Sequence, residues 1–263
     1  MNIYGISHIG NSRNNQEDNF LINKNYFDLN AVKNFSKELP GAYSECTTDS
    51  HTILVAVSDG MGGHSSGEVA SYLTVKYLAD NYSTFCCVDR KKIEDAVANL
   101  NRYVSSQSKV DPEYNGMGAT LCGVACCEGQ VIGFNAGDSR LYRFDNGNLI
   151  QISKDHSEGQ RLLDLNLLNA EELKKFPNRK AIYRYVGMRS ELIPNVFDVP
   201  CCQNGTVLLL CSDGLSDVVE DVEIQDALLS SGSLKDKGEK LLNTALGRNV
   251  GHGDNITVIL IEF

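Results

Sequence analysis

The sequence lacks several features that mark common functional classes. It has no basic excess: 24 Lys and Arg face 34 Asp and Glu, for a formal net charge of -10. A nucleic-acid or anionic-membrane surface would need clustered Lys and Arg. No apolar run approaches the roughly 20 residues of a membrane helix, and the N-terminus is not built like a signal peptide. We therefore expect a cytoplasmic protein without nucleic-acid or membrane partners.

The sequence also lacks the signatures of several ligand sites. Its nine cysteines include three adjacent pairs but no Cys-x-x-Cys, which disfavours zinc and a disulfide framework and indicates a reducing compartment. No 12-residue EF-hand loop is present, and no glycine-rich phosphate loop ends in Lys-Ser/Thr. A calcium-sensor module and a nucleotide-hydrolysing enzyme are therefore disfavoured.

The chain is 263 residues long, 42% hydrophobic and undivided by a linker, so we expect one domain over residues 1–263. Periodicity predicts two strand pieces around a polar loop within 1–23, an exposed excursion over 24–51, and an antiparallel meander from 120 to 152. Helices are predicted after residue 63 (Val69, Leu73 and Tyr77 on one face), across 90–104 (Ile93, Val97, Leu100 and Val104), near 224–229 and over 234–246.

Two apolar runs end in the same tripeptide. Residues 53–57 lead into Ser58-Asp59-Gly60, and residues 207–211 lead into Ser212-Asp213-Gly214. A single Asp-Gly after a strand is usually only a sharp turn. The recurrence makes Asp59 and Asp213 candidates for one shared site, where two repelling carboxylates would need cations or a shared proton.

Two further carboxylates, Asp138 and Asp254, flank predicted strands, although each alone could be an ordinary turn residue. Oxygen ligands without interleaved His or Cys indicate magnesium, manganese or calcium. Carboxylates gathered from distant positions are typical of two-metal hydrolytic sites that act on phosphate esters.

Residues 155–192 are the most basic part of this acidic chain. They include Arg161, Lys174, Lys175, Arg179 and Lys180. Such a run can be a solvated helical face or a flap that attracts an anionic substrate, and the sequence leaves both open.

A set of short motifs, in order along nearly the whole chain, resembles the metal-dependent protein phosphatase 2C family, specifically its bacterial serine/threonine phosphatases. The motifs are Arg13-x-x-x-Glu17-Asp18, Asp59-Gly60-Met61-Gly62-Gly63-His64, Gly118-Ala119-Thr120, Gly137-Asp138-Ser139-Arg140, Asp155-His156, Ser212-Asp213-Gly214 and Asp254-Asn255. The resemblance implies an α+β fold of four layers, with two central antiparallel sheets between pairs of helices.

The resemblance also implies roles for matching positions around two core Mn2+ or Mg2+ ions. Asp59 and the Gly60 carbonyl would bridge the ions, Asp213 and Asp254 would bind one, and Asp18 would act on the other side. Glu17 would orient the attacking water, Arg13 would clamp the phosphate, and Asp138 with Asp213 would hold a weaker third ion.

The proton donor is a departure from the family pattern. Eukaryotic relatives carry a histidine directly after Asp-Gly, where this chain has Met61, and His64 follows three residues later. His64 and a water on the third ion are therefore both candidates.

The resemblance implies phosphorylated proteins as substrates, and we expect a monomer. The sequence leaves open the physiological substrate, the preferred metal and the existence of a cognate serine/threonine kinase. A catalytically inactive pseudophosphatase acting as a regulatory binding module is the alternative. Loss of a metal-binding carboxylate would favour it, but every such carboxylate is present.

Overall fold

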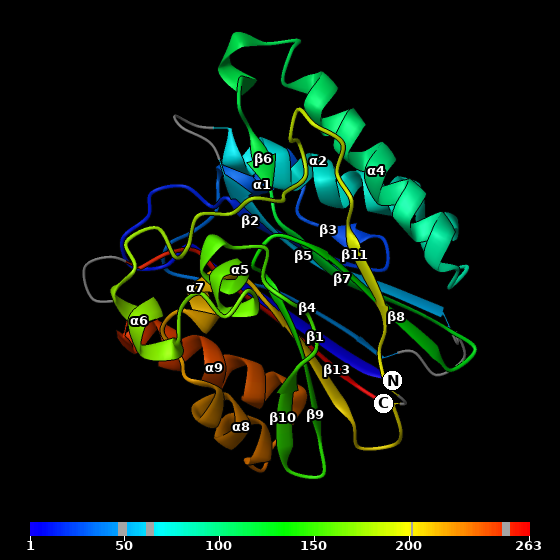
Figure 1. The fold of residues 1–263 in the computed structure, drawn as a ribbon. Coiled ribbons are helices and arrows are strands. Elements are labelled where there is room, and N and C mark those ends of the chain that lie inside the picture. The colour runs from blue at the N-terminus through cyan, green and yellow to red at the C-terminus, as the bar shows by residue number, and fades with distance from the viewer. Residues whose placement is uncertain (47–51, 62–65, 201, 249–252) are drawn as a thin grey trace.

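Two antiparallel β-sheets form the centre of the computed structural model, which describes residues 1–46, 52–61, 66–200, 202–248 and 253–263 (Figure 1). The six-stranded sheet has the order β10 (Asn148–Gln151), β9 (Arg140–Asp145), β12 (Val207–Cys211), β13 (Ile256–Glu262), β1 (Asn2–His8), β4 (Gly41–Cys46). The seven-stranded sheet has the order β11 (Asn195–Asp198), β8 (Gln130–Ala136), β7 (Leu121–Cys127), β5 (Thr52–Met61), β2 (Asp18–Ile22), β3 (Asn25–Tyr26), with β6 (Gly118–Ala119) also paired to β5.

Helices cover the outer faces of both sheets (Figure 1). The seven-stranded sheet carries α2 (Gly67–Asp80) and α4 (Arg90–Gln107), and the six-stranded sheet carries α8 (Asp221–Leu229) and α9 (Leu234–Arg248). Shorter helices are α1 (Leu29–Lys33), α3 (Tyr82–Phe85), η1 (Pro112–Tyr114), α5 (Glu158–Asp164), α6 (Ala170–Lys175) and α7 (Asp213–Ser216). The predicted four-layer α+β fold is confirmed. Over the described ranges, none of these helices is long and apolar enough to cross a membrane.

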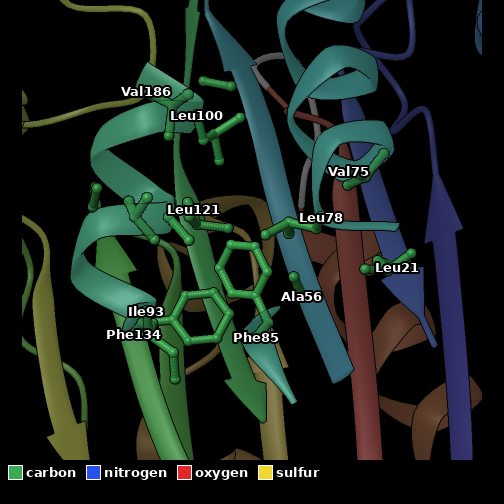
Figure 2. Packing of buried hydrophobic residues seen from close by; sticks show 14 of the residues in the cluster. Leu21, Ala56, Val75, Leu78, Phe85, Ile93, Leu100, Leu121, Phe134 and Val186 are labelled. Atoms are coloured by element: carbon green, nitrogen blue, oxygen red, sulfur yellow. The ribbon is translucent and has the colours of Figure 1, made fainter. Parts of the chain in front are cut away.

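Three apolar clusters fill the three spaces between the four layers. Figure 2 shows the first, in which side chains from α4 and α2 pack on the seven-stranded sheet and the Phe85 and Phe134 rings lie 5.6 Å apart. The second joins the six-stranded sheet to α8 and α9. The third lies between the sheets and includes Ile3, Phe20 and Leu210. Burial of apolar area on three levels is the main favourable term that holds the layers together.

The helix predictions succeed where the apolar pattern is strong. In α4, Asp89 caps the first turn by accepting from the Lys92 backbone N–H, and all four predicted core residues are fully buried. In α2, the predicted core residues Leu73 and Tyr77 are only partly buried, so the buried face of the helix differs from the predicted one. The buried apolar residues of α2 are Val69, Ala70, Val75 and Leu78.

Two predictions about strands are wrong. The strands between 121 and 151 are not one meander, because β7 and β8 belong to the seven-stranded sheet whereas β9 and β10 belong to the six-stranded sheet. The excursion over 24–51 is not simply exposed, because it contains β3, α1 with the buried Val32, and β4, which forms an edge of the six-stranded sheet. Local periodicity cannot tell which of two sheets a strand joins.

Candidate active site

Two of the connections that carry candidate residues cross between the two sheets. Residues 9–17 lead from β1 to β2 and include Arg13 and Glu17, while residues 137–139 lead from β8 to β9 and include Asp138. Asp213 begins α7 after β12, and Asp254 precedes β13. Both β12 and β13 belong to the six-stranded sheet, so the polar side chains come from both sheets and from the connections between them.

Asp18 and Asp59 are direct partners across the β2–β5 pair, so their side chains share one face of the sheet. The predicted sharp turn at Asp59 is wrong, because β5 continues through Gly60 and Met61 and pairs there with β6. Gly60 donates its backbone N–H to the Glu17 carbonyl at 3.0 Å, which ties β5 to the end of the 9–17 connection.

Asp18 is fully buried, and only one of its two carboxylate oxygens accepts hydrogen bonds. Its Oδ2 accepts hydrogen bonds from the hydroxyls of Ser212 and Thr257, each at 2.7 Å, whereas its Oδ1 has no hydrogen-bond partner. An unpaired buried carboxylate oxygen is costly. It therefore indicates a place for a donor or a cation.

Asp59 is held through its backbone. Its N–H donates to Thr120 Oγ1 at 2.9 Å, and its carbonyl accepts from the Thr120 N–H at 2.8 Å. Thr120 Oγ1 also lies 2.7 Å from Ser139 Oγ, beside Asp138. The Gly118-Ala119-Thr120 segment thus ties β5 to the crossing that carries Asp138.

Asn255 organises the opposite side of the site. Its Oδ1 accepts from the Glu17 N–H at 2.7 Å, and its Nδ2 donates to the carbonyls of Ile9 and Asn15. The neighbouring Asp254 accepts from Arg13 Nη2 at 2.7 Å in an ion pair. One buried amide therefore fixes both ends of the connection that carries Arg13 and Glu17.

The electrostatics of the site show that its carboxyls converge. Burial raises the pKa of Asp59 well above its ordinary value, and the charges of Asp18, Asp213, Asp254 and Asp138 raise it further. Burial also raises the pKa of Asp18, Asp138 and Asp213, and that of Glu17 to about 7. The charge of Asp213 is among the causes that raise the pKa of Asp59, so these two carboxyls lie near each other.

The donor set fits hard divalent cations. Asp213 Oδ1, like Asp18 Oδ1, is buried without a hydrogen-bond partner, and the surrounding acidic groups repel one another. Across the part of the chain that the structure describes, no three His, Cys, Asp or Glu side chains are already arranged to enclose an ion. The assignment of individual ligands therefore stays a prediction.

Asp155 and His156, quoted above as a motif, brace the Asp138 crossing. His156 Nδ1 accepts from the Gly137 backbone N–H at 3.1 Å, and the His156 backbone N–H donates to the Gly137 carbonyl at 2.9 Å. Arg140 pairs with the Asp155 carboxylate through Nε and Nη2. Burial lowers the pKa of His156 to about 4, so the imidazole is neutral and can accept.

The basic segment 155–192 lies against the site. A cavity of about 270 Å³ is lined by Asp138 and Asp213 on one side and by Leu163, Leu173 and Arg179 of this segment on the other. Lys180 also lines the cavity and pairs with Asp217, just beyond Asp213. The segment contains α5 and α6, which lie close to α7 in Figure 1.

Sequence reasoning missed the side chains that hold the carboxylates. Thr120, Ser212 and Asn255 lie inside the quoted motifs without an assigned role, and Thr257 lies two residues beyond Asn255. Ser212 and Asn255 could have been found by their adjacency to Asp213 and Asp254, whereas Thr120 is next to no candidate carboxylate in the sequence. Asp138, predicted to hold the third ion and its water, lines one cavity with Asp213, whereas His64, the other proton-donor candidate, lies outside the described residues.

Comparison with known proteins agrees with this geometry. The model of the family described as protein phosphatase 2C matches residues 42–249. The serine/threonine phosphatase stp of Listeria welshimeri is 35% identical over 214 residues, which cover 80% of this chain and 84% of that protein. The serine/threonine protein phosphatase PstP of Mycobacterium tuberculosis is 34% identical over 210 residues, which cover 80% of this chain and 40% of that protein.

Solved structures show the same fold over almost the whole chain. The serine/threonine phosphatase of S. agalactiae superposes with a TM-score of 0.82 at 26% identity, covering 98% of this chain and 97% of that chain. The Mycobacterium tuberculosis phosphatase PstP/Ppp gives 0.77 at 30% identity, covering 100% of this chain and 99% of that chain. Because the family model matches most of the chain and relatives at more than 30% identity cover 80% of it, the chain belongs to the protein phosphatase 2C family and is a serine/threonine phosphatase.

Proposed function

We propose that the chain removes phosphate from phosphoserine and phosphothreonine in proteins, using Mn2+ or Mg2+ at the carboxylate site. The observation that carries this proposal is the pair of buried, unpartnered oxygens, Asp18 Oδ1 and Asp213 Oδ1, in a set of mutually repelling acidic groups. Two divalent ions bound there would activate a water and neutralise phosphate charge. Asp18, Asp59, Asp213, Asp254 and the Gly60 carbonyl would hold the two core ions.

Arg13 and Glu17 act on substrate and water in this proposal. Arg13 donates from Nη2 to Asp254, and about half of its side chain is exposed, so its remaining N–H groups can donate to phosphate oxygens. Glu17 has a pKa of about 7 because it is buried, with Arg13 acting in the opposite direction. A carboxyl that titrates near neutral pH can accept a proton from the attacking water.

We propose that a water donates the proton to the leaving group. Asp138 and Asp213 would together hold a weaker third ion, and that ion would bind the water. A serine alkoxide needs a proton as the P–O bond breaks, whereas an aryl oxide leaves without one. Asp138 lines the same cavity as Arg179 and Lys180, so the 155–192 segment would act as a flap that steers anionic phosphoproteins to that side. We further propose that the chain works as a cytoplasmic monomer opposite a serine/threonine kinase.

The test is dephosphorylation of a phosphothreonine peptide by the purified chain. We expect turnover with Mn2+ or Mg2+, loss of turnover with a chelator, and recovery when metal is returned. An absence of turnover with either metal would support the pseudophosphatase alternative, which no observation in the structure favours. Turnover that persists in chelator would overturn the metal assignment.

A further inference from the structure

The buried hydrogen bonds behind Asp18 form a continuous chain. Thr257 Oγ1 lies 2.7 Å from both Asp18 Oδ2 and Ser7 Oγ, and Gln16 Nε2 donates to Ser7 Oγ at 2.6 Å. Ser212 Oγ lies 2.7 Å from the same Asp18 oxygen and accepts from the Thr257 N–H at 3.0 Å. The chain joins the 9–17 connection, β1, β13 and the end of β12 to the first residue of β2.

The direction of every hydroxyl proton in this chain is determined when Asp18 is ionised. A carboxylate only accepts and an amide nitrogen only donates, and each hydroxyl has a single proton. Gln16 therefore donates to Ser7, Ser7 donates to Thr257, and Thr257 donates to Asp18 Oδ2. Ser212 accepts from the Thr257 backbone, so its proton also points to that oxygen.

No solvent competes with these bonds, because Ser7, Gln16, Asp18, Ser212 and Thr257 are each at most 1% exposed. Two donors on Oδ2 fix the carboxylate plane, and Oδ1 is left without a partner. Hydrogen bonds that orient a ligating carboxylate change metal affinity by about 10- to 100-fold when they are removed.

We infer that Thr257, supported by Ser7 and Gln16 and assisted by Ser212, is a positioning residue that orients Asp18 Oδ1 toward the divalent cation and sets the affinity of the site for it. This inference rests on the proposed function. The competing view is that the chain only ties the two sheets together, in which case its loss would lower stability and leave metal affinity unchanged.

The experiment compares Thr257→Val, Thr257→Ser and Thr74→Val. Valine keeps the shape of threonine and removes the hydroxyl, whereas serine keeps the hydroxyl. Thr74 is an equally buried threonine whose hydroxyl donates to the Ala70 carbonyl within α2 and takes no part in this chain of bonds, so Thr74→Val is the matched control for losing a buried hydroxyl. The readouts are the Kd for Mn2+ alone by calorimetry, the melting temperature, and kcat at saturating Mn2+.

We expect Thr257→Val to raise the Kd for Mn2+ by about tenfold or more, Thr257→Ser to restore it to within about threefold, and Thr74→Val to lower only the melting temperature. At saturating Mn2+, kcat of Thr257→Val should be closer to the wild-type value than its Kd for Mn2+ is. Folded Thr257→Val with wild-type Mn2+ affinity would overturn the inference. Should Thr257→Val not fold, Ser212→Ala decides in the same assay, with unchanged affinity again overturning it.

The outcome is separable from that of the proposed function. If wild type binds no Mn2+ and cleaves no phosphopeptide, the proposed function fails. If wild type does both and the threonine series shows no change in Kd, only the positioning role fails.

Discussion

The two Ser-Asp-Gly segments have identical sequences and different structures. Ser58-Asp59-Gly60 continues strand β5, and the Ser58 hydroxyl donates to the Thr120 carbonyl. Ser212-Asp213-Gly214 opens helix α7, and the Ser212 hydroxyl donates to Asp18 in the other sheet. The charge of Asp213 nevertheless raises the pKa of Asp59, so long-range packing of the two sheets, and not local conformation, brings the two carboxyls near each other.

The glycines of the two segments serve a common purpose. A Cβ on Gly60 would lie 2.0 Å from the Gly67 carbonyl oxygen, and a Cβ on Gly214 would lie 1.9 Å from the Asn255 carbonyl oxygen. Both glycines therefore let a second backbone pack directly against the segment that carries the carboxylate.

The largest expected effect is on turnover, and it should be the same for both segments. Asp59→Asn and Asp213→Asn should each lower kcat on a phosphothreonine peptide by several orders of magnitude, because each removes a charge that we assign to the metal site, while both proteins stay folded. Loss of one crowded carboxylate can even raise the melting temperature without metal. Activity and thermal melts are measured together. Wild-type turnover in either variant would contradict the shared two-metal assignment.

The next effect is on stability. Gly60→Ala and Gly214→Ala should each lower the free energy of unfolding by about 3 kcal/mol or more, because backbone must move to admit the Cβ. Gly247→Ala, near the end of α9, is the control, since a Cβ there meets none of the described residues within 4 Å, and alanine should not destabilise the protein. Chemical denaturation measures all three. A mild effect at only one of the two glycines would show that the segments are packed differently.

These segments also show what sequence can predict. Apolar runs predicted the strands around Asp59 and Asp213, and the helix pattern of α4 predicted its buried face, because both depend on local periodicity. The partition of strands between two sheets was not predicted, since it depends on long-range pairing such as that of β5 with β7. Ser212 and Thr257 were missed for the same reason, because their partner Asp18 is 194 and 239 residues away in sequence.

We expect Asp213, but not Asp59, to help Asp138 hold the water that protonates the leaving group. The variant Asp138→Ala tests this role. If a water held by Asp138 and Asp213 supplies the leaving-group proton, this variant should depress phosphopeptide turnover at least ~10-fold more than aryl phosphate turnover. His64→Ala should then affect neither substrate much. Steady-state rates of both variants on both substrates decide it. A phosphopeptide-selective loss confined to His64→Ala would identify the histidine as the donor.

The pH dependence of stability should follow from the crowded carboxyls on both segments. Their folded-state pKa values are raised by burial, and that of Glu17 reaches about 7, so the folded state holds more protons than the unfolded state above about pH 4. Without metal, the free energy of unfolding should therefore fall as pH rises.

The clean window for this measurement is pH 6.5 to 8. Below it, His8 and His156 act in the opposite direction, because burial lowers the pKa of both. We expect the melting temperature in chelator to drop by about 2 to 4 °C for each kcal/mol lost, Asp59→Asn to flatten this slope, and Mn2+ to stabilise more at pH 8 than at pH 6.5. A melting temperature in chelator that rises across this window would contradict the proposed electrostatics.

The smallest expected effect is on substrate selection by the cavity that Asp213 lines and Asp59 does not. Arg179 lines this cavity, whereas Lys174 is exposed on α6 and pairs with Glu171. Arg179→Glu should therefore lower kcat/KM on an acidic phosphopeptide by about three- to tenfold, because it reverses a charge that attracts the substrate. Lys174→Glu is the matched control with the same charge change, and it should have a smaller effect.

Aryl phosphate hydrolysis should change little in either variant, because neither residue is assigned to the metal site. Equal losses on both substrates in Arg179→Glu would show that the 155–192 segment supports the site structurally and does not select substrates.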